Sequence, residues 1–313
     1  MTTPRIAGSL VIALGGNALD PGSGGQDAWR LLDETARQIA MLAAAGHRIA
    51  LVHGNGPQVG ALLLQNEAGR AIVPPAGLDV LDAETQGQLG YLIQQHTGNH
   101  LRRLGHDQAV VELVTQVVVD AADPAFQTPT KPIGPFYPSE TAAPAAAPGA
   151  VVRAVAPGRW RRVVASPRPQ RIVELAAVRT LWDAGVIALA AGGGGIPVVE
   201  GPDGLHGVEA VVDKDYAAAR LALDLGAERL IVLTNVDGVY VDHGRPGQHR
   251  LDRLTVREGR RLLAAGQFAP GSMGPKVEAC LDFVAAGGRS AVIAMAPEAL
   301  GAVAGTVGTV ILP

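Results

Sequence analysis

The segment that most constrains the fold is residues 186–199, where an apolar run ends in four consecutive glycines, Gly192 to Gly195. A six-residue run of Val, Ile, Leu and Ala is typical of a buried strand. A plain turn needs only one or two glycines, so four of them indicate that another group approaches this backbone closely. A bare loop at the carboxyl end of a strand presents N–H groups to an anion. The segment predicts an anion-binding strand end, with a flexible turn as the alternative.

Three other apolar runs end in a similar way. Residues 11–14 lead into the sequence GGN, residues 49–52 into HGNGP, and residues 230–233 into TNVDG. In an open parallel sheet the carboxyl ends of the strands lie along one edge, and ligands bind there. The sequence therefore predicts one site to which all four strand ends contribute.

Composition limits the class of protein. Hydrophobic residues make up 48% of the 313 residues but aromatic residues only 4%, so the core must be built from Ala, Val, Leu and Ile. A net charge of −3 gives no reason to expect a nucleic-acid or membrane-surface partner. The single cysteine, Cys280, fits a reducing compartment and lies at helical spacing with core residues. No signal peptide or long uncharged run is present, so we expect a cytoplasmic globular protein.

Strand and helix patterns alternate along most of the chain, which predicts a mainly parallel α/β sheet with right-handed crossovers. The periodicities predict strands at 10–14, 49–53, 108–119, 186–191, 230–233, 291–295 and 309–312, and a hairpin within 197–212. They predict helices at 27–45, from Pro57, at 83–104, at 171–184, from Asp213, at 255–265 and at 275–285.

Eight of the 22 prolines fall between residues 124 and 157. Such a stretch cannot form a regular central strand or a long helix. It is either a linker or a small subdomain, and we favour the subdomain because several valines and Trp160 offer apolar packing. Within it, Lys131 stands before Pro132 in the sequence PTKP, which fixes where its side chain points.

The sequence lacks the motifs of several common nucleotide-binding, hydrolase and metal sites. The chain contains no GxxxxGK[ST] loop, no GxGxxG after a strand and no GxSxG elbow. His96 and His100 lie four residues apart on a predicted helix without a neighbouring glutamate, so we interpret them as a solvated helix face and predict no metal site.

The three lysines are the other residues whose positions in the sequence indicate a particular chemistry. The chain has only three, Lys131, Lys214 and Lys276, and each occupies a proline junction or a helix start. Point charges beside backbone N–H groups are what phosphoryl transfer requires, because catalysis there is mostly positioning and electrostatic stabilisation. Asp215 is expected to hold the lysines, whereas Asp213 could do the same, assist Mg²⁺ or cap the helix.

Together these motifs resemble the carbamate kinases of the amino acid kinase superfamily. The resemblance covers nearly the whole chain and is carried by ALGGNAL (13–19), HGNGPQVG (53–60), TQGQLGY (85–91), PTKPIGPFY (129–137), AGGGGIPVV (191–199), GVEAVVDKDYAA (207–218) and FAPGSMGPKVEA (268–279). It implies an open, mainly parallel eight-stranded sheet sandwiched between helices, with a small protruding subdomain at about 131–166. It also implies a homodimer.

The resemblance implies a reversible, Mg²⁺-dependent phosphoryl transfer between carbamoyl phosphate and ADP. A lobe of residues 1–212 would bind carbamate or carbamoyl phosphate, and residues 213–313 would bind ATP or ADP. Lys131, Lys214 and Lys276 would act on the migrating group, with Asp215 orienting them. The phosphoryl and carbamate groups would be bound by Gly15, Gly16, Asn17, Gly54, Asn55, Gly56, Gly193 and Gly194, and the nucleotide by Thr234, Val236, Asp237, Tyr240, Met273 and Pro275.

Two other functions remain open at this point. One is a superfamily kinase with another acceptor, such as acetylglutamate, glutamate or a nucleoside monophosphate. The proline-framed Lys131 argues against it, since those kinases lack the protruding subdomain. The other is a nucleotide-binding sensor without catalysis, against which the intact lysines and Asp215 argue.

Overall fold

The computed structural model describes residues 7–15, 21–139 and 151–313. Its centre is an eight-stranded sheet, and all neighbouring strands in it run parallel except β16 and β17. In order across the sheet the strands are β15 (Arg253–Thr255), β17 (Thr309–Leu312), β16 (Ser290–Met295), β12 (Arg229–Thr234), β1 (Gly8–Leu14), β2 (His47–His53), β9 (Ile187–Leu189) and β3 (Val110–Glu112). The predicted α/β sheet of eight mainly parallel strands is confirmed.

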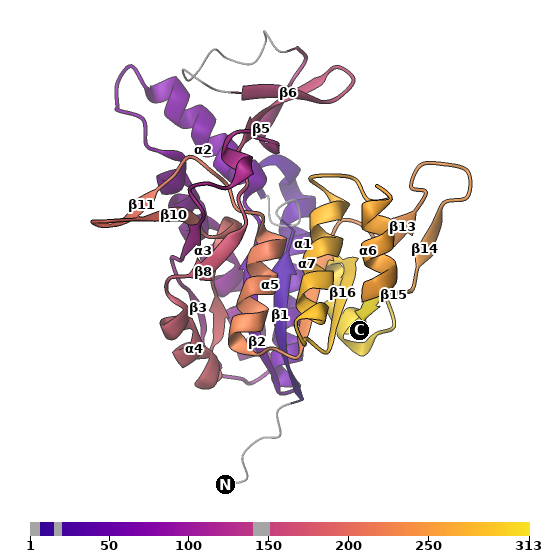
Figure 1. Ribbon diagram of the computed structural model, residues 1–313. Helices are drawn as coiled ribbons and strands as arrows, with labels where there is room; N and C mark the ends of the chain where they lie inside the picture. The colour runs from indigo at the N-terminus through magenta and orange to yellow at the C-terminus, as the bar shows by residue number, and fades with distance from the viewer. Residues whose placement is uncertain (1–6, 16–20, 140–150) are drawn as a thin grey trace.

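Helices cover both faces of this sheet (Figure 1). Successive side chains of a strand point to opposite faces, so β1 sends Leu10, Ile12 and Leu14 into one core and Val11 and Ala13 into the other. One core is shared with α1 (Pro21–Ala44), α3 (Leu78–Arg103) and α8 (Ala299–Ala304), and the other with α4 (Leu175–Asp183), α5 (Lys214–Leu225), α6 (Val256–Ala264) and α7 (Met273–Ala285).

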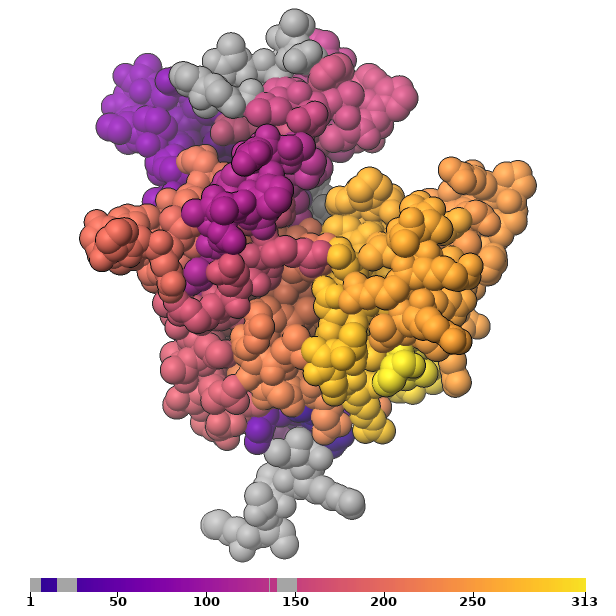
Figure 2. All heavy atoms as spheres, in the orientation of Figure 1, coloured from indigo at the N-terminus to yellow at the C-terminus, as the bar shows by residue number. Residues whose placement is uncertain are grey.

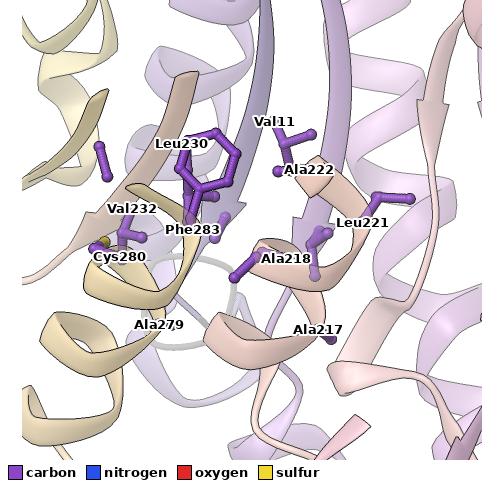
Figure 3. Close-up of a cluster of buried hydrophobic side chains, with 14 of the residues drawn as sticks. Val11, Ala217, Ala218, Leu221, Ala222, Leu230, Val232, Ala279, Cys280 and Phe283 are labelled. Carbon is purple, nitrogen blue, oxygen red and sulfur yellow. The ribbon is translucent and has the colours of Figure 1, made fainter. Parts of the chain in front are cut away.

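Helices α5 and α7 pack against the sheet through apolar side chains, which on α5 are mostly alanines. Ala218 and Ala222 of α5 and Cys280 and Phe283 of α7 lie over the strands, with Ala222 near Val11 and Cys280 near Val232 (Figure 3). Cys280 is fully buried, as its helical spacing predicted, and burial raises the pKa of its thiol. This packing fixes the two helices whose first turns carry Lys214 and Lys276.

Three smaller sheets surround the main one. β11 (Gly204–Gly207), β10 (Ile196–Gly201), β4 (Gln116–Val119) and β8 (Pro169–Ile172) form the first, and β13 (Val239–Val241) pairs with β14 (His249–Leu251) in the second. The third, made of β5 (Lys131–Tyr137), β7 (Arg159–Val164) and β6 (Val151–Ala156), protrudes from the body together with α2 (Gly56–Gly69) (Figures 1 and 2). The proline-rich segment is thus a small subdomain, and the linker alternative is wrong for its described part.

Two predicted elements are corrected. The expected strand 108–119 is two strands in different sheets, β3 and β4, because Gln86 of α3 binds the backbone of Thr115 through both ends of its amide and turns the chain there. The expected helix 171–184 begins only at Leu175, since the residues from Pro169 pair with β4 as β8. Gly98 does not interrupt α3.

None of the helices in the described part of the chain is long and apolar enough to span a membrane. The main sheet takes strands from both sides of residue 212, so the expected division into two lobes remains a prediction about binding.

Candidate active site

Four neighbouring strands deliver the predicted loops to one place. β12, β1, β2 and β9 are adjacent and parallel, and a cavity of about 550 Å³ lies at their carboxyl ends. Gly15, Gly54, Gly193 and Thr234, each just beyond or at the end of its strand, line this cavity. The predicted convergence of strand ends is confirmed.

The four-glycine loop owes its composition to close contacts. A Cβ atom on Gly193 would lie 2.4 Å from the Asn55 Nδ2 atom, and one on Gly194 would lie 2.2 Å from the Val212 carbonyl oxygen. Both glycines also have positive φ angles, +70° and +104°, which side chains of L-residues rarely adopt. The loop therefore needs glycine for space and for conformation, and the flexible-turn alternative is wrong.

Asn55 is held in one orientation beneath this loop. Its Nδ2 atom donates to Asp82 Oδ1 and to Thr85 Oγ1, both at 2.8 Å, and all three residues are buried. Burial raises the pKa of Asp82 well above its usual value, although the bond from Asn55 opposes this. Asn55 is also the N-cap residue of α2, so the amino end of this helix faces the cavity, where it favours negative charge.

Asp215 joins two of the three lysines. Lys214 Nζ donates to Asp215 Oδ1, and Lys276 Nζ donates to Oδ2 at 2.8 Å. Burial lowers the pKa of Lys214 to about 8, and the carboxylate of Asp215 limits this fall. Burial alone would raise the pKa of Asp215, but the two ammonium groups outweigh it and hold that pKa below its usual value. The pair of cations is therefore fixed on α5 and α7 at the cavity wall.

Lys131 reaches the same cavity from the protruding subdomain. It is the first residue of β5, and its Nζ atom donates to Asp213 Oδ2. Asp213 also caps α5, because its Oδ1 atom accepts from the Asp215 backbone N–H at 3.0 Å. Of the roles left open for Asp213, the structure shows the helix cap and an ion pair with Lys131.

Most of the predicted site residues meet here, but not all. The cavity is lined by Gly15, Gly54, Asn55, Gly56, Lys131, Gly193, Lys214, Asp215, Thr234, Val236, Met273 and Lys276. Gly194, Asp237, Tyr240 and Pro275 are not among its lining residues. Gly194 is buried within the loop against the backbone of Val212, and the Tyr240 hydroxyl donates to Asp237 Oδ1 at 2.9 Å at the base of the β13–β14 hairpin. Gly16 and Asn17 lie outside the described residues.

Sequence reasoning missed part of the lining. Met295, which ends β16, and Ala296 and Pro297, which follow it, also line the cavity. A fifth apolar strand ending in small residues and proline was the signal that could have identified them. Leu31, Val211 and Val212 also line the cavity, and only their placement in the fold indicates it.

The interpretation of His96 and His100 as a solvated helix face is wrong. His96 Nδ1 and His100 Nε2 lie 2.8 Å and 3.0 Å from the same atom, Oδ1 of Asp33 on α1, and His100 is buried. The two histidines therefore attach α3 to α1. Within the described ranges no group of three or more His, Cys, Asp or Glu residues is arranged to hold a metal ion.

Comparisons with known proteins agree with this geometry. The model of the Amino acid kinase family matches residues 9–295. The chain is 44% identical to the carbamate kinase of Pyrococcus furiosus over 310 residues, which are 97% of this chain and 99% of the relative. It is 46% identical to the carbamate kinase of Halobacterium salinarum over 306 residues, 97% of this chain and 98% of that one.

A solved structure with a similar fold supports the same family assignment. The carbamate kinase of Giardia lamblia bound to AMP-PNP superposes with a TM-score of 0.88 at 39% identity, covering 97% of this chain and 98% of the other. Sequence and fold agree over nearly the full length of both proteins. The chain therefore belongs to the amino acid kinase family and, within it, to the carbamate kinases, which makes it a kinase.

Proposed function

We propose that this enzyme transfers the phosphoryl group of carbamoyl phosphate to ADP, reversibly, giving ATP and carbamate, which decomposes to carbon dioxide and ammonia. The observation that supports this most strongly is the meeting of the chain's only three lysines in one cavity, two of them on a single buried aspartate. The migrating phosphoryl group carries its charge on oxygen atoms, and these cations would stabilise it.

The two substrates would bind to residues from different segments of the chain. Carbamoyl phosphate would occupy the strand ends supplied by residues 1–212, against Gly54, Asn55 and Gly193, and ADP would lie against residues 213–313, near Val236 and Met273. Lys131 would exchange its ion pair with Asp213 for the oxygen atoms of the bound anion. No general base is required, because both attacking groups are already anions.

Mg²⁺ would enter the site bound to the nucleotide. Both oxygens of Asp215 accept from lysines, and those of Asp213 accept from Lys131 and a backbone N–H, so every oxygen of the two carboxylates already has a hydrogen-bond partner. Mg²⁺ prefers to keep several waters and to bind substrate phosphates with few protein ligands. We therefore treat Mg²⁺ as part of the nucleotide substrate.

A homodimer is also part of the proposal. Val80 and Tyr91 lie eleven residues apart on α3, which is three helical turns, so both face the same side, and they are 46% and 58% exposed. Val114, which follows the edge strand β3, is 56% exposed as well. A second copy of the chain would cover this apolar surface.

The deciding experiment is ATP formation by the purified protein from carbamoyl phosphate, ADP and Mg²⁺. We expect rapid formation by the wild type and a loss of roughly 100-fold or more in Lys214→Ala and in Lys276→Ala, as occurs when an electrostatic donor is removed. Arg171→Ala, which removes an exposed cation paired with Glu200, serves as the control and should retain activity.

Two results would overturn the assignment. Near-normal activity of both lysine variants would contradict the roles of these residues. A wild type that binds ADP but forms no ATP would contradict the reaction, and a panel of other acyl phosphates would then separate a different acceptor from a sensor.

A further inference from the structure

Outside the cavity, the half-exposed Arg168 contacts both helices that carry the paired lysines. It lies in the short connection between β7, which ends the protruding sheet at Val164, and β8. Its Nη2 atom is 2.5 Å from Glu278 Oε1 of α7, and its guanidinium carbon lies 3.5 Å from the centre of the Tyr216 ring of α5. Tyr216 in turn donates its hydroxyl to Glu278 Oε2 at 2.6 Å. These three side chains, the Arg168 clamp, therefore close on themselves.

The clamp is attached to the lysines through the chain. Tyr216 directly follows Asp215 on α5, and Glu278 lies two residues after Lys276 on α7. The clamp thus joins α5 and α7 on the outside, while Asp215 joins them inside the cavity.

The same residue leads to the third lysine. Val164 of β7 pairs with Lys131 of β5, and Arg168 follows Val164 by four residues. The Arg168 backbone N–H donates to Asp123 Oδ2 at 3.0 Å, and the Ala165 carbonyl accepts from the Val211 N–H at 3.0 Å. The base of the subdomain is therefore fixed to the body immediately beside the clamp, with Arg168 as the link between the Lys131 strand pair and helices α5 and α7.

We propose that Arg168 is a positioning residue for phosphoryl transfer, which sets the spacing of Lys131 relative to Lys214 and Lys276 through Tyr216 and Glu278. This inference rests on the proposed function. Arg168 touches no lining residue that the transfer requires, and its contacts suit arginine specifically: a planar guanidinium can stack on a ring and donate to a carboxylate at the same time.

The effects expected on stability and on rate distinguish this positioning role from a purely structural one. The Arg168 side chain is 47% exposed, and exposed ion pairs contribute little to stability. Positioning of reacting groups, in contrast, affects rate strongly, since a displacement of about 1 Å can cost about 100-fold. Loss of the clamp should therefore reduce turnover much more than it reduces the melting temperature.

The test compares Arg168→Ala, Arg168→Lys, Glu278→Gln and the double variant Arg168→Ala/Glu278→Gln, with Arg171→Ala as the control. We expect kcat to fall roughly 10- to 100-fold in Arg168→Ala while KM for both substrates and the melting temperature stay near the wild-type values. Arg168→Lys should recover part of kcat. Glu278→Gln should lower kcat as well, and the double variant should lose no more than the worse single variant, because the two side chains act as a unit.

The proposal is overturned if Arg168→Ala keeps the wild-type kcat, if the losses of the two single variants add, or if turnover falls only in step with the melting temperature. Hydrogen exchange gives a reading that does not depend on the reaction. Backbone amides in the first turns of α5 and α7 and in β5 should exchange faster in Arg168→Ala than in the wild type. In Arg171→Ala they should exchange at the wild-type rate. A wild type without ATP formation would refute the proposed function alone, and unchanged exchange would refute the clamp.

Discussion

Individual residues in the cavity are tuned by burial and by their partners. Lys214 is the clearest case, because burial lowers its pKa to about 8 while Asp215 keeps it from falling further. In the proposed reaction its ammonium form would stabilise the migrating phosphoryl group, so its protonation should control activity on the alkaline side.

The first prediction concerns this titration. We expect kcat/KM to fall as the pH rises through about 8, because Lys214 loses its proton in the free enzyme. In Asp215→Asn the ammonium loses its favourable partner, so the alkaline fall should move to lower pH and kcat should drop roughly 100-fold. A kcat/KM profile against pH for both proteins measures the shift.

Asp224→Asn is the matched control. Asp224 lies on the same helix and pairs with Arg220, far from the cavity lining, so its replacement should leave the profile in place. An alkaline fall that stays where it is in Asp215→Asn would exclude Lys214 as the titrating group.

At the scale of single elements, the loop after β9 shows how a turn is fixed by what packs against it. Gly193 and Gly158 have nearly the same φ, +70° and +66°, but only Gly193 is crowded. A Cβ atom on Gly158 would meet nothing within 4 Å, whereas one on Gly193 would meet the Asn55 amide.

The pair of variants Gly193→Ala and Gly158→Ala separates conformational strain from crowding. Both should lose about 1 kcal/mol for a left-handed residue. Gly193→Ala should lose about 1–3 kcal/mol more from overpacking, and also most of its activity, since Asn55 is held by Asp82 and Thr85 and cannot move away. Urea unfolding and ATP formation measure the two effects. Equal losses of stability in the two variants would contradict the crowding argument.

The elements also show the limit of local patterns. Residues 108–119 read as one β-branched strand, but the turn at Thr115 comes from Gln86, which is 29 residues earlier in the chain. Likewise, His96 and His100 look like surface residues on α3 until Asp33 of α1 is placed against them. In both cases the deciding partner is distant in sequence.

At the scale of the whole molecule, the main sheet has an open edge at β3, beside the exposed face of α3. We predict that the wild type elutes as a dimer in size-exclusion chromatography with light scattering. Tyr91→Asp should shift it toward the monomer, because a buried unpaired charge at an interface is costly.

Val155→Asp provides the control for this experiment. Val155 is similarly exposed, at 40%, but lies on β6 of the protruding subdomain. The Val155→Asp variant should remain dimeric. A wild type that is monomeric at all concentrations, or a Tyr91→Asp variant that stays dimeric, would exclude this face as the interface.

The sequence by itself determined the sheet, the strand ends and the lysines. Those features are local, since periodicity marks strands and helices, glycine runs mark close approach, and the lysines Lys131, Lys214 and Lys276 stand out by their rarity. Only the tertiary structure decided which partners these residues have. The pairing of Lys131 with Asp213, the orientation of Asn55 by Asp82 and the contact of Arg168 with α5 and α7 join segments 27 to 110 residues apart. Such contacts depend on how elements pack, which no local pattern of residues records.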